Sequence, residues 1–141
     1  MNSPLPLLVV VAAIIALGVT GNLFSPSPFV IAAQVGAIVM NLWGRLLFQK
    51  GTFRVSAGPS ANVLIRRGPY RIVRHPMYFA ALVFIWAGVA SHVSAFTLSI
   101  GAVATGACIA RALVEEQMLR EKYPDYVDYA RSTKMLIPFI F

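Results

Sequence analysis

Residues 75–110 read HPMYFAALVFIWAGVASHVSAFTLSIGAVATGACIA and contain no Lys, Arg, Asp or Glu. An apolar helix needs about 20 residues to cross the hydrocarbon core of a bilayer. The stretch therefore fits two membrane helices, with a turn at the polar residues 91–94. Because this turn is short, we expect an antiparallel hairpin whose two open ends lie side by side.

A second block without charges covers residues 1–44, and the Gly, Asn, Ser and Pro residues between 21 and 28 predict a turn within it. Residues 1–24 are interpreted as a span and not as a cleaved signal peptide, since no Lys or Arg precedes a long apolar run. Charged residues make up 12% of the chain, against roughly 25% in soluble domains. The sequence predicts an all-α polytopic membrane bundle, a single domain over 1–141, with about four transmembrane helices and a C-terminal cytoplasmic helical tail. The expected spans are about 5–23, 28–48, 77–91 and 94–112.

The distribution of charge predicts the orientation of the bundle. All 12 basic and 5 acidic residues lie in two stretches, 45–74 and 111–134, and the first of these is purely basic. Basic loops stay on the cytoplasmic side of membranes. We therefore expect cytoplasmic termini and a cytoplasmic 49–76 loop, in the inner or plasma membrane if the source is bacterial. This rule also accounts for the net charge of +7 without a nucleic-acid partner.

Two helix faces are expected to make contacts between helices. The polar face of the second span should point into the bundle, and the small-residue face of the fourth span allows two helices to approach closely, within the bundle or between two copies. The single cysteine, Cys108, lies in the fourth span and is interpreted as a packing residue. The polar face is Gln34, Asn41 and Arg45, and the small-residue face is Ala102, Gly106 and Ala110.

The charged tail predicts further helix outside the membrane. The spacing of charges after Arg111 indicates that the fourth span continues as a helix until a break at Pro124. A short helix is expected over residues 125–132. Residues 135–141 are apolar but too short to span, so we expect them to pack against the bundle or lie in the membrane interface.

Two clusters of reactive side chains flank the hairpin, and the hairpin should bring them together. The first is GPYRIVRHPMY at 68–78, and the second is RALVEE at 111–116, followed by spaced tyrosines. Basic residues ahead of a helix start suit an anion, whereas a carboxylate pair suits an amine, a ribose hydroxyl or a cation. A zwitterionic nucleoside cofactor would satisfy both clusters. The alternatives without a ligand are membrane anchoring by basic and aromatic residues and a solvated ion pair on a helix face.

The first cluster, the apolar hairpin and the run RALVEEQMLREKYPDYVDYARSTKMLIPF together resemble the isoprenylcysteine carboxyl methyltransferase family and the related phospholipid N-methyltransferases. The resemblance covers about residues 60–138. It implies S-adenosylmethionine as the cofactor, bound without a Rossmann domain, and no metal. It also implies that Arg111 and Glu115 are catalytic, with Arg111 orienting the acceptor. The cofactor-binding residues that it implies are Tyr70, Arg74, His75, Tyr78, Glu115 and Glu116.

The sequence departs from the family pattern at two places and leaves the substrate open. Ala80 stands where the family often has Gly, and Lys134-Met135 replaces a closing Arg. The N-terminal half matches nothing distinctive, although substrate selection would lie largely there. The methyl acceptor and the oligomeric state are therefore left open.

The sequence favours methyl transfer to a lipophilic acceptor, and the preferred acceptor is an isoprenylcysteine-type carboxylate. The expected partners are a lipophilic small molecule or prenylated substrate, together with membrane lipids. An amine or thiol of a phospholipid or other small lipid is the alternative, and it would require Glu115 or His75 as a base. Two other classes remain: NADPH-dependent membrane reductases, which share an RHPxY-like run but are much longer, and non-enzymatic assembly proteins. Transport is disfavoured, since the expected spans hold no ionisable residue except Arg45 at an edge.

Overall fold

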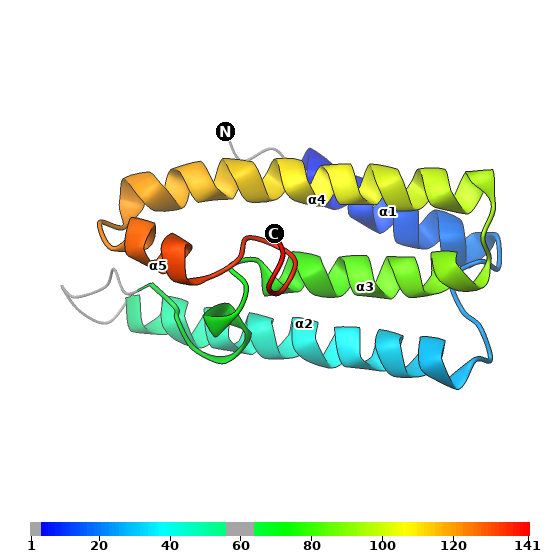
Figure 1. Cartoon of the computed structure of the whole chain (residues 1–141), viewed down its shortest axis with the longest axis horizontal. Helices are drawn as coiled ribbons and strands as arrows, with labels where there is room; N and C mark the ends of the chain where they lie inside the picture. The colour runs from blue at the N-terminus through cyan, green and yellow to red at the C-terminus, as the bar shows by residue number, and fades with distance from the viewer. Residues whose placement is uncertain (1–3, 56–63) are drawn as a thin grey trace. The chain divides into compact units, whose positions relative to one another are not determined.

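The computed structural model describes residues 4–55 and 64–141, with side chains for 4–47 and 64–141. Over these residues the chain is helical, without a β-strand (Figure 1). A single-residue parallel bridge joins Val73 to Lys134. The elements in chain order are α1 (Leu5–Val19), α2 (Pro28–Val55), the 3-10 helix η1 (Gly68–Arg71), α3 (Pro76–Ser91), α4 (Ala95–Lys122) and α5 (Tyr126–Ser132).

The four apolar helices occur where the charge-free blocks predicted them, although their ends differ. The predicted first span, to residue 23, is too long: α1 ends at Val19, where the Thr20 hydroxyl donates to the carbonyl of Ala16 at 2.7 Å and Gly21 adopts φ +73°. The second helix is longer than predicted, because α2 continues past residue 48 to Val55.

Two of the helices are long and apolar enough to cross a membrane, namely the Pro28–Leu47 part of α2 and α4. The apolar helices α1 and α3 are shorter, with 15 and 16 residues. At a rise of about 1.5 Å per residue, such helices are roughly 22–24 Å long, less than the ~30 Å hydrocarbon core. The four-span count therefore stays a prediction, and it requires local thinning or helix ends in the headgroup region.

The tail follows the predicted pattern closely. The helix α4 continues without interruption beyond Arg111 to Lys122, the chain breaks around Pro124, and α5 begins at Tyr126. Proline lacks the backbone donor that would continue the α4 ladder, which explains the break.

The described chain divides into two compact units, which are treated separately below. The first unit contains Met1–Val39 and Ala80–Arg111, and the second contains Met40–Phe79 and Ala112–Phe141.

The polar face of α2 is confirmed in two of its three positions. Gln34 is buried in the first unit, where its Nε2 donates to the carbonyl of Leu23 at 2.7 Å. In the second unit, Nδ2 of Asn41 donates to the carbonyl of Met77 at 3.3 Å. Arg45 is exposed. The two amides thus bond main-chain carbonyls, which is how a polar group is tolerated among apolar helices.

The small residues predicted to allow close helix approach in α4 do not pack within the first unit, and pairing through them stays a prediction. Ala102, Gly106 and Ala110 are all exposed, whereas Gly101 and Ala104 are buried in the first unit. A Cβ added at Gly101 would lie 3.0 Å from the ring of Trp86, which belongs to α3. Both faces carry small residues, so their spacing alone could not distinguish them. The indole of Trp86, which also donates to Thr105 at 3.0 Å, decides which face packs.

Replacing Gly88 of α3 with alanine is expected to destabilise the first unit, because the added Cβ would lie 2.6 Å from the carbonyl oxygen of Leu23. Backbone cannot move aside cheaply, so the cost should be about 1–3 kcal/mol, measured as a lower midpoint of thermal unfolding in detergent. Gly106→Ala is the matched control, since nothing lies within 4 Å of its added Cβ. It should be neutral or stabilising by about 0.5–1 kcal/mol. Equal midpoints for the two variants would contradict the packing described here.

Candidate functional site

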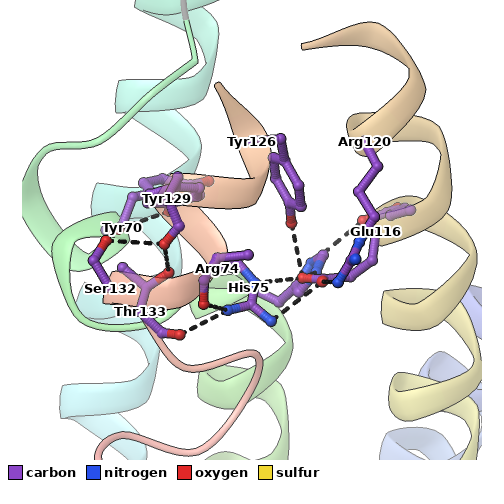
Figure 2. Close-up of polar contacts among 11 residues, drawn as sticks. Tyr70, Arg74, His75, Glu116, Arg120, Tyr126, Tyr129, Ser132 and Thr133 are labelled. Atoms are coloured by element: carbon purple, nitrogen blue, oxygen red, sulfur yellow. Dashed lines mark hydrogen bonds and ion pairs between the residues drawn. The ribbon is translucent and has the colours of Figure 1, made fainter. Parts of the chain in front are cut away.

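The first cluster and the glutamates of the second lie together in the second unit, as we expected from the short hairpin. The main chain sets the register: the amides of Arg74 and His75 donate to the carbonyls of Lys134 and Met135 at 2.8 and 3.1 Å, and the Lys134 amide donates back to Ile72 at 3.1 Å. The run before α3 is therefore paired with the segment that follows α5. Figure 2 shows the side chains that gather around this pairing.

The local sequence explains why His75 stands where α3 begins. Pro76 is the first residue of the helix, a position that suits proline because its missing N–H is not needed there. The residue before a proline avoids helical geometry, so His75 ends the extended run. Its carbonyl accepts the amide of Phe79 at 3.1 Å and so starts the helix.

Gly68 opens η1 in a conformation that an L side chain rarely adopts, with φ +62°. A Cβ at this position would lie 2.5 Å from the Leu47 side chain and 3.2 Å from the ring of Trp43. The backbone angle therefore favours glycine here, and any larger residue would also require the side chains of Leu47 and Trp43 to shift.

Glu116 is the centre of the cluster, and it is buried. Arg74 binds it with two donors, Nε to Oε1 and Nη2 to Oε2, the latter at 3.2 Å. The hydroxyl of Tyr126 donates to Oε1 at 2.8 Å, and Nε2 of His75 lies 3.3 Å from the same oxygen. Arg120 completes the set from solvent, at 3.8 Å (Figure 2). The hydrogen-bonding capacity of the Glu116 carboxylate is thus satisfied by donors from the segment before α3, from α4 and from α5.

Arg74 connects this carboxylate to the tail. Its Nη1 donates to the carbonyls of Ala130 and Thr133 at 3.0 and 2.7 Å. These carbonyls lie at the C-terminal end of α5 and just after it, where a helix leaves its last acceptors without intrahelical donors. The Arg74 side chain is only 10% exposed. Its guanidinium therefore links α4, the segment before α3 and the tail at one point.

Glu115 differs from Glu116 in its surroundings. Its side chain is 26% exposed, against 7% for Glu116. The Tyr78 hydroxyl donates to it at 2.7 Å, and Nδ1 of His75 lies 3.6 Å away. The rings of His75 and Tyr78 are stacked, with centroids 5.6 Å apart. Glu115 and Tyr78 thus form the more accessible part of the cluster, and the buried His75 contacts both.

The spaced tyrosines have structural partners that the sequence did not reveal. The Tyr129 hydroxyl donates to the carbonyl of Tyr70 at 2.7 Å, and the Tyr70 hydroxyl donates to Gly44 at 3.4 Å. Burial, and then the charge of Glu115, raise the pKa of Tyr70 to about 12, so the phenol stays protonated. Tyr126 and Tyr129 fix α5 to the cluster, and their spacing of three residues on one helix face was the available signal.

The two carboxylates oppose the effect of burial on the charge of His75. Burial alone would lower the pKa of this imidazole, but hydrogen bonds and the charges of Glu115 and Glu116 raise it above its usual 6.5. For Glu116, burial raises the pKa, but donors from His75, Arg74 and Tyr126 lower it to about 2. Glu116 is therefore ionised at neutral pH, and its charge and that of Glu115 favour the protonated form of His75.

The stability of the second unit should depend on pH in both directions. Glu116 contributes stability above pH 4.5, its usual pKa, and this is lost as the pH falls toward 2. His75 contributes stability below pH 6.5, and this is lost as the pH rises through its raised pKa. Resistance of the tail to proteolysis should therefore be greatest between about pH 4.5 and 6.5. The variant His75→Gln should lack the alkaline decline, and an identical decline in both proteins would contradict the assignment.

The structure brings five of the predicted site residues into direct contact. Arg74, His75, Tyr78, Glu115 and Glu116 form the cluster, and Tyr70 joins it through Tyr129. Arg111 is the last residue of the first unit, and α4 continues from it into the second. Among the residues described, no group of three or more His, Cys, Asp or Glu is placed to hold a metal ion.

Comparison with known proteins adds one finding. The family model described as phospholipid methyltransferase matches residues 5–126, which include α1 to α4 and the first residue of α5. No curated protein matches the chain, and no solved structure does.

Proposed function

The chain belongs to the phospholipid methyltransferase family, and from this premise we propose that it transfers methyl groups from S-adenosylmethionine to a lipophilic acceptor. Family membership makes the protein a membrane methyltransferase. The observation that carries the finer proposal is the contact of His75 and Tyr78 with Glu115, at the start of an apolar helix.

The donor set of the cluster fits the proposed cofactor. Glu115 is partly exposed and anionic, so it can accept hydrogen bonds from an amino group or a ribose hydroxyl. His75, whose pKa is raised by two carboxylates, lies just before the start of α3 and suits a carboxylate. We assign direct cofactor contacts to Glu115, Tyr78 and His75. Arg74 and Glu116, which have protein partners on all sides, and Tyr70, which is buried, would shape the site around them.

S-adenosylmethionine, when bound, supplies a methyl group that its sulfonium has already activated. The residues of this chain then need to orient the two reactants and exclude water. Arg111, one helical turn before Glu115 on α4, is proposed to hold the acceptor group.

The acceptor that we propose is an isoprenylcysteine-type carboxylate, giving O-methyl transfer. A carboxylate needs no general base, whereas an ammonium or thiol must lose a proton. His75 is poorly placed to act as a base, because both of its ring nitrogens already face carboxylates, Nδ1 Glu115 and Nε2 Glu116. Glu115, the other candidate base, already accepts a hydrogen bond from the Tyr78 hydroxyl. The family description favours the second candidate, the amine of a phospholipid.

For the whole chain we propose four spans with both termini and the cluster on the cytoplasmic side. Lipid acceptors would then enter between helices from the bilayer, and the water-soluble cofactor from the cytoplasm. The basic stretch 45–74 supports this orientation.

The test is calorimetry of the detergent-purified protein with S-adenosylmethionine, with NADPH as the competing ligand, followed by transfer of labelled methyl groups. A farnesylated cysteine derivative and phosphatidylethanolamine serve as the two acceptors. We expect binding of S-adenosylmethionine alone and labelling of the farnesylated carboxylate. Labelling of phosphatidylethanolamine only would establish the second candidate, and binding of NADPH only would refute the proposal.

A further inference from the structure

The last six residues form a closed loop that points apolar side chains outward. The amides of Leu136 and Ile137 both donate to the carbonyl of Phe141 at 2.7 Å, which closes the loop. Leu136 is buried, but Phe139 is 83% exposed and Ile140 is 76% exposed. Phe139, which is not a glycine, also adopts the left-handed backbone conformation at the tip of the loop, with φ +64°.

These features are unfavourable for a loop in water. Glycine is the usual residue at a positive φ, and an aromatic residue there is a conformational outlier. Two exposed apolar residues at the same tip add to the cost of hydration. Such strain persists where the surroundings or a function require it, so the exposed tip needs an occupant.

The position of the loop indicates which surface covers its exposed tip. The amide of His75 donates to the carbonyl of Met135, and Leu136 follows directly. The loop is therefore tied to the residue that precedes α3, where the apolar stretch begins. If α3 enters the bilayer at Pro76, the loop lies at the level of the headgroups.

The charges beside the loop support the same occupant. Arg71 and Lys134 are exposed and belong to the two segments joined by the Val73–Lys134 bridge. Basic residues next to exposed apolar side chains are the pattern of segments that lie in the interface of anionic membranes.

We propose that the closed loop formed by residues 136–141, called the C-terminal loop, inserts Phe139 and Ile140 into the cytoplasmic leaflet and holds the tail against the membrane. The proposal rests on the membrane placement of α3 given above, but not on the identity of the cofactor or acceptor. The loop lies outside the residues matched by the family model, which end at Tyr126. It would keep the Glu116 cluster, to which the tail is bound by Arg74, next to the lipid phase from which an acceptor arrives.

The test uses the full chain with Cys108→Ala, reconstituted in vesicles of phosphatidylcholine and phosphatidylglycerol. A single cysteine is introduced at Phe139 and carries an environment-sensitive fluorophore. The matched control is Val127→Cys, an exposed apolar position on α5 outside the loop. We expect lipid-borne nitroxide to quench the label at 139 several-fold more than at 127, and aqueous iodide to do the reverse. Ile140→Cys repeats the measurement if the first variant does not fold.

Equal access of iodide to both positions would overturn the proposal. So would protection at 139 that depends on protein concentration and not on lipid, since a second copy would then cover the loop. Neither readout involves the cofactor, so a loop that inserts in a protein without methyl transfer would refute the proposed function and leave this inference standing.

Discussion

Arg74→Ala is expected to detach the tail and lower the stability of the second unit by about 3–5 kcal/mol. The substitution removes the two-point partner of Glu116 and the donors to Ala130 and Thr133. A buried carboxylate left without its cation costs more than the lost hydrogen bonds alone. The measurement is the midpoint of thermal unfolding in detergent, with a fall of roughly 10 °C or more, together with faster proteolysis of residues after Lys122.

Arg120→Ala is the matched control, because Arg120 approaches the same carboxylate at 3.8 Å but is 56% exposed. An exposed pair contributes about 0–1 kcal/mol, so this variant should unfold almost as the parent does. Glu116→Gln in the Arg74→Ala background should restore part of the loss, since the neutral amide removes the buried charge. If the two arginine variants unfold alike, Arg74 does not have the role assigned here.

Glu115→Ala is expected to reduce methyl transfer by roughly 100-fold or more while the bundle stays folded. Its side chain is partly exposed, and its partners Tyr78 and His75 are also supported by stacking on each other. Loss of the carboxylate should appear first as weaker binding of S-adenosylmethionine in calorimetry. Arg111→Ala should reduce transfer to a similar extent but leave cofactor affinity close to that of the parent, because we assign it to the acceptor.

The control for both is Glu121→Ala, which removes an exposed carboxylate from the same helix. Its transfer rate should equal that of the parent protein. Normal turnover in Glu115→Ala or in Arg111→Ala would refute the corresponding assignment. A loss of cofactor affinity in Arg111→Ala equal to that in Glu115→Ala would instead place both residues at the cofactor.

The helices could be predicted from the sequence because their signals are local. Charge-free blocks, the turn residues near 25 and 92, and Pro124 determine where a chain can form apolar helix and where it must stop. The meeting of the two clusters was also predictable, since a short turn makes the hairpin ends adjacent. The same reasoning predicted the continuation of α4 and the short helix α5.

Roles within the cluster could not be predicted in this way. Glu115 and Glu116 are neighbours in sequence and looked equivalent, but a helix turns by about 100° per residue and points them in different directions. Only the packing of α5 and the final segment shows that Glu116 is enclosed by Arg74 and Tyr126. The face of α4 that packs within the first unit could not be predicted for a similar reason, as two adjacent faces both carry small residues and Trp86 contacts one of them, at Gly101.

The sequence by itself determined the order of the apolar helices and the set of residues that could carry chemistry, because hydropathy and chain breaks act over a few neighbouring residues. The tertiary structure alone decided which of these residues are enclosed and which stay accessible. That division depends on contacts between residues far apart in the chain, such as Arg74 with Thr133 and Glu116 with Tyr126. Their energy arises from burial and from donors that surround a charge, and neither is written in the spacing of residues along the chain.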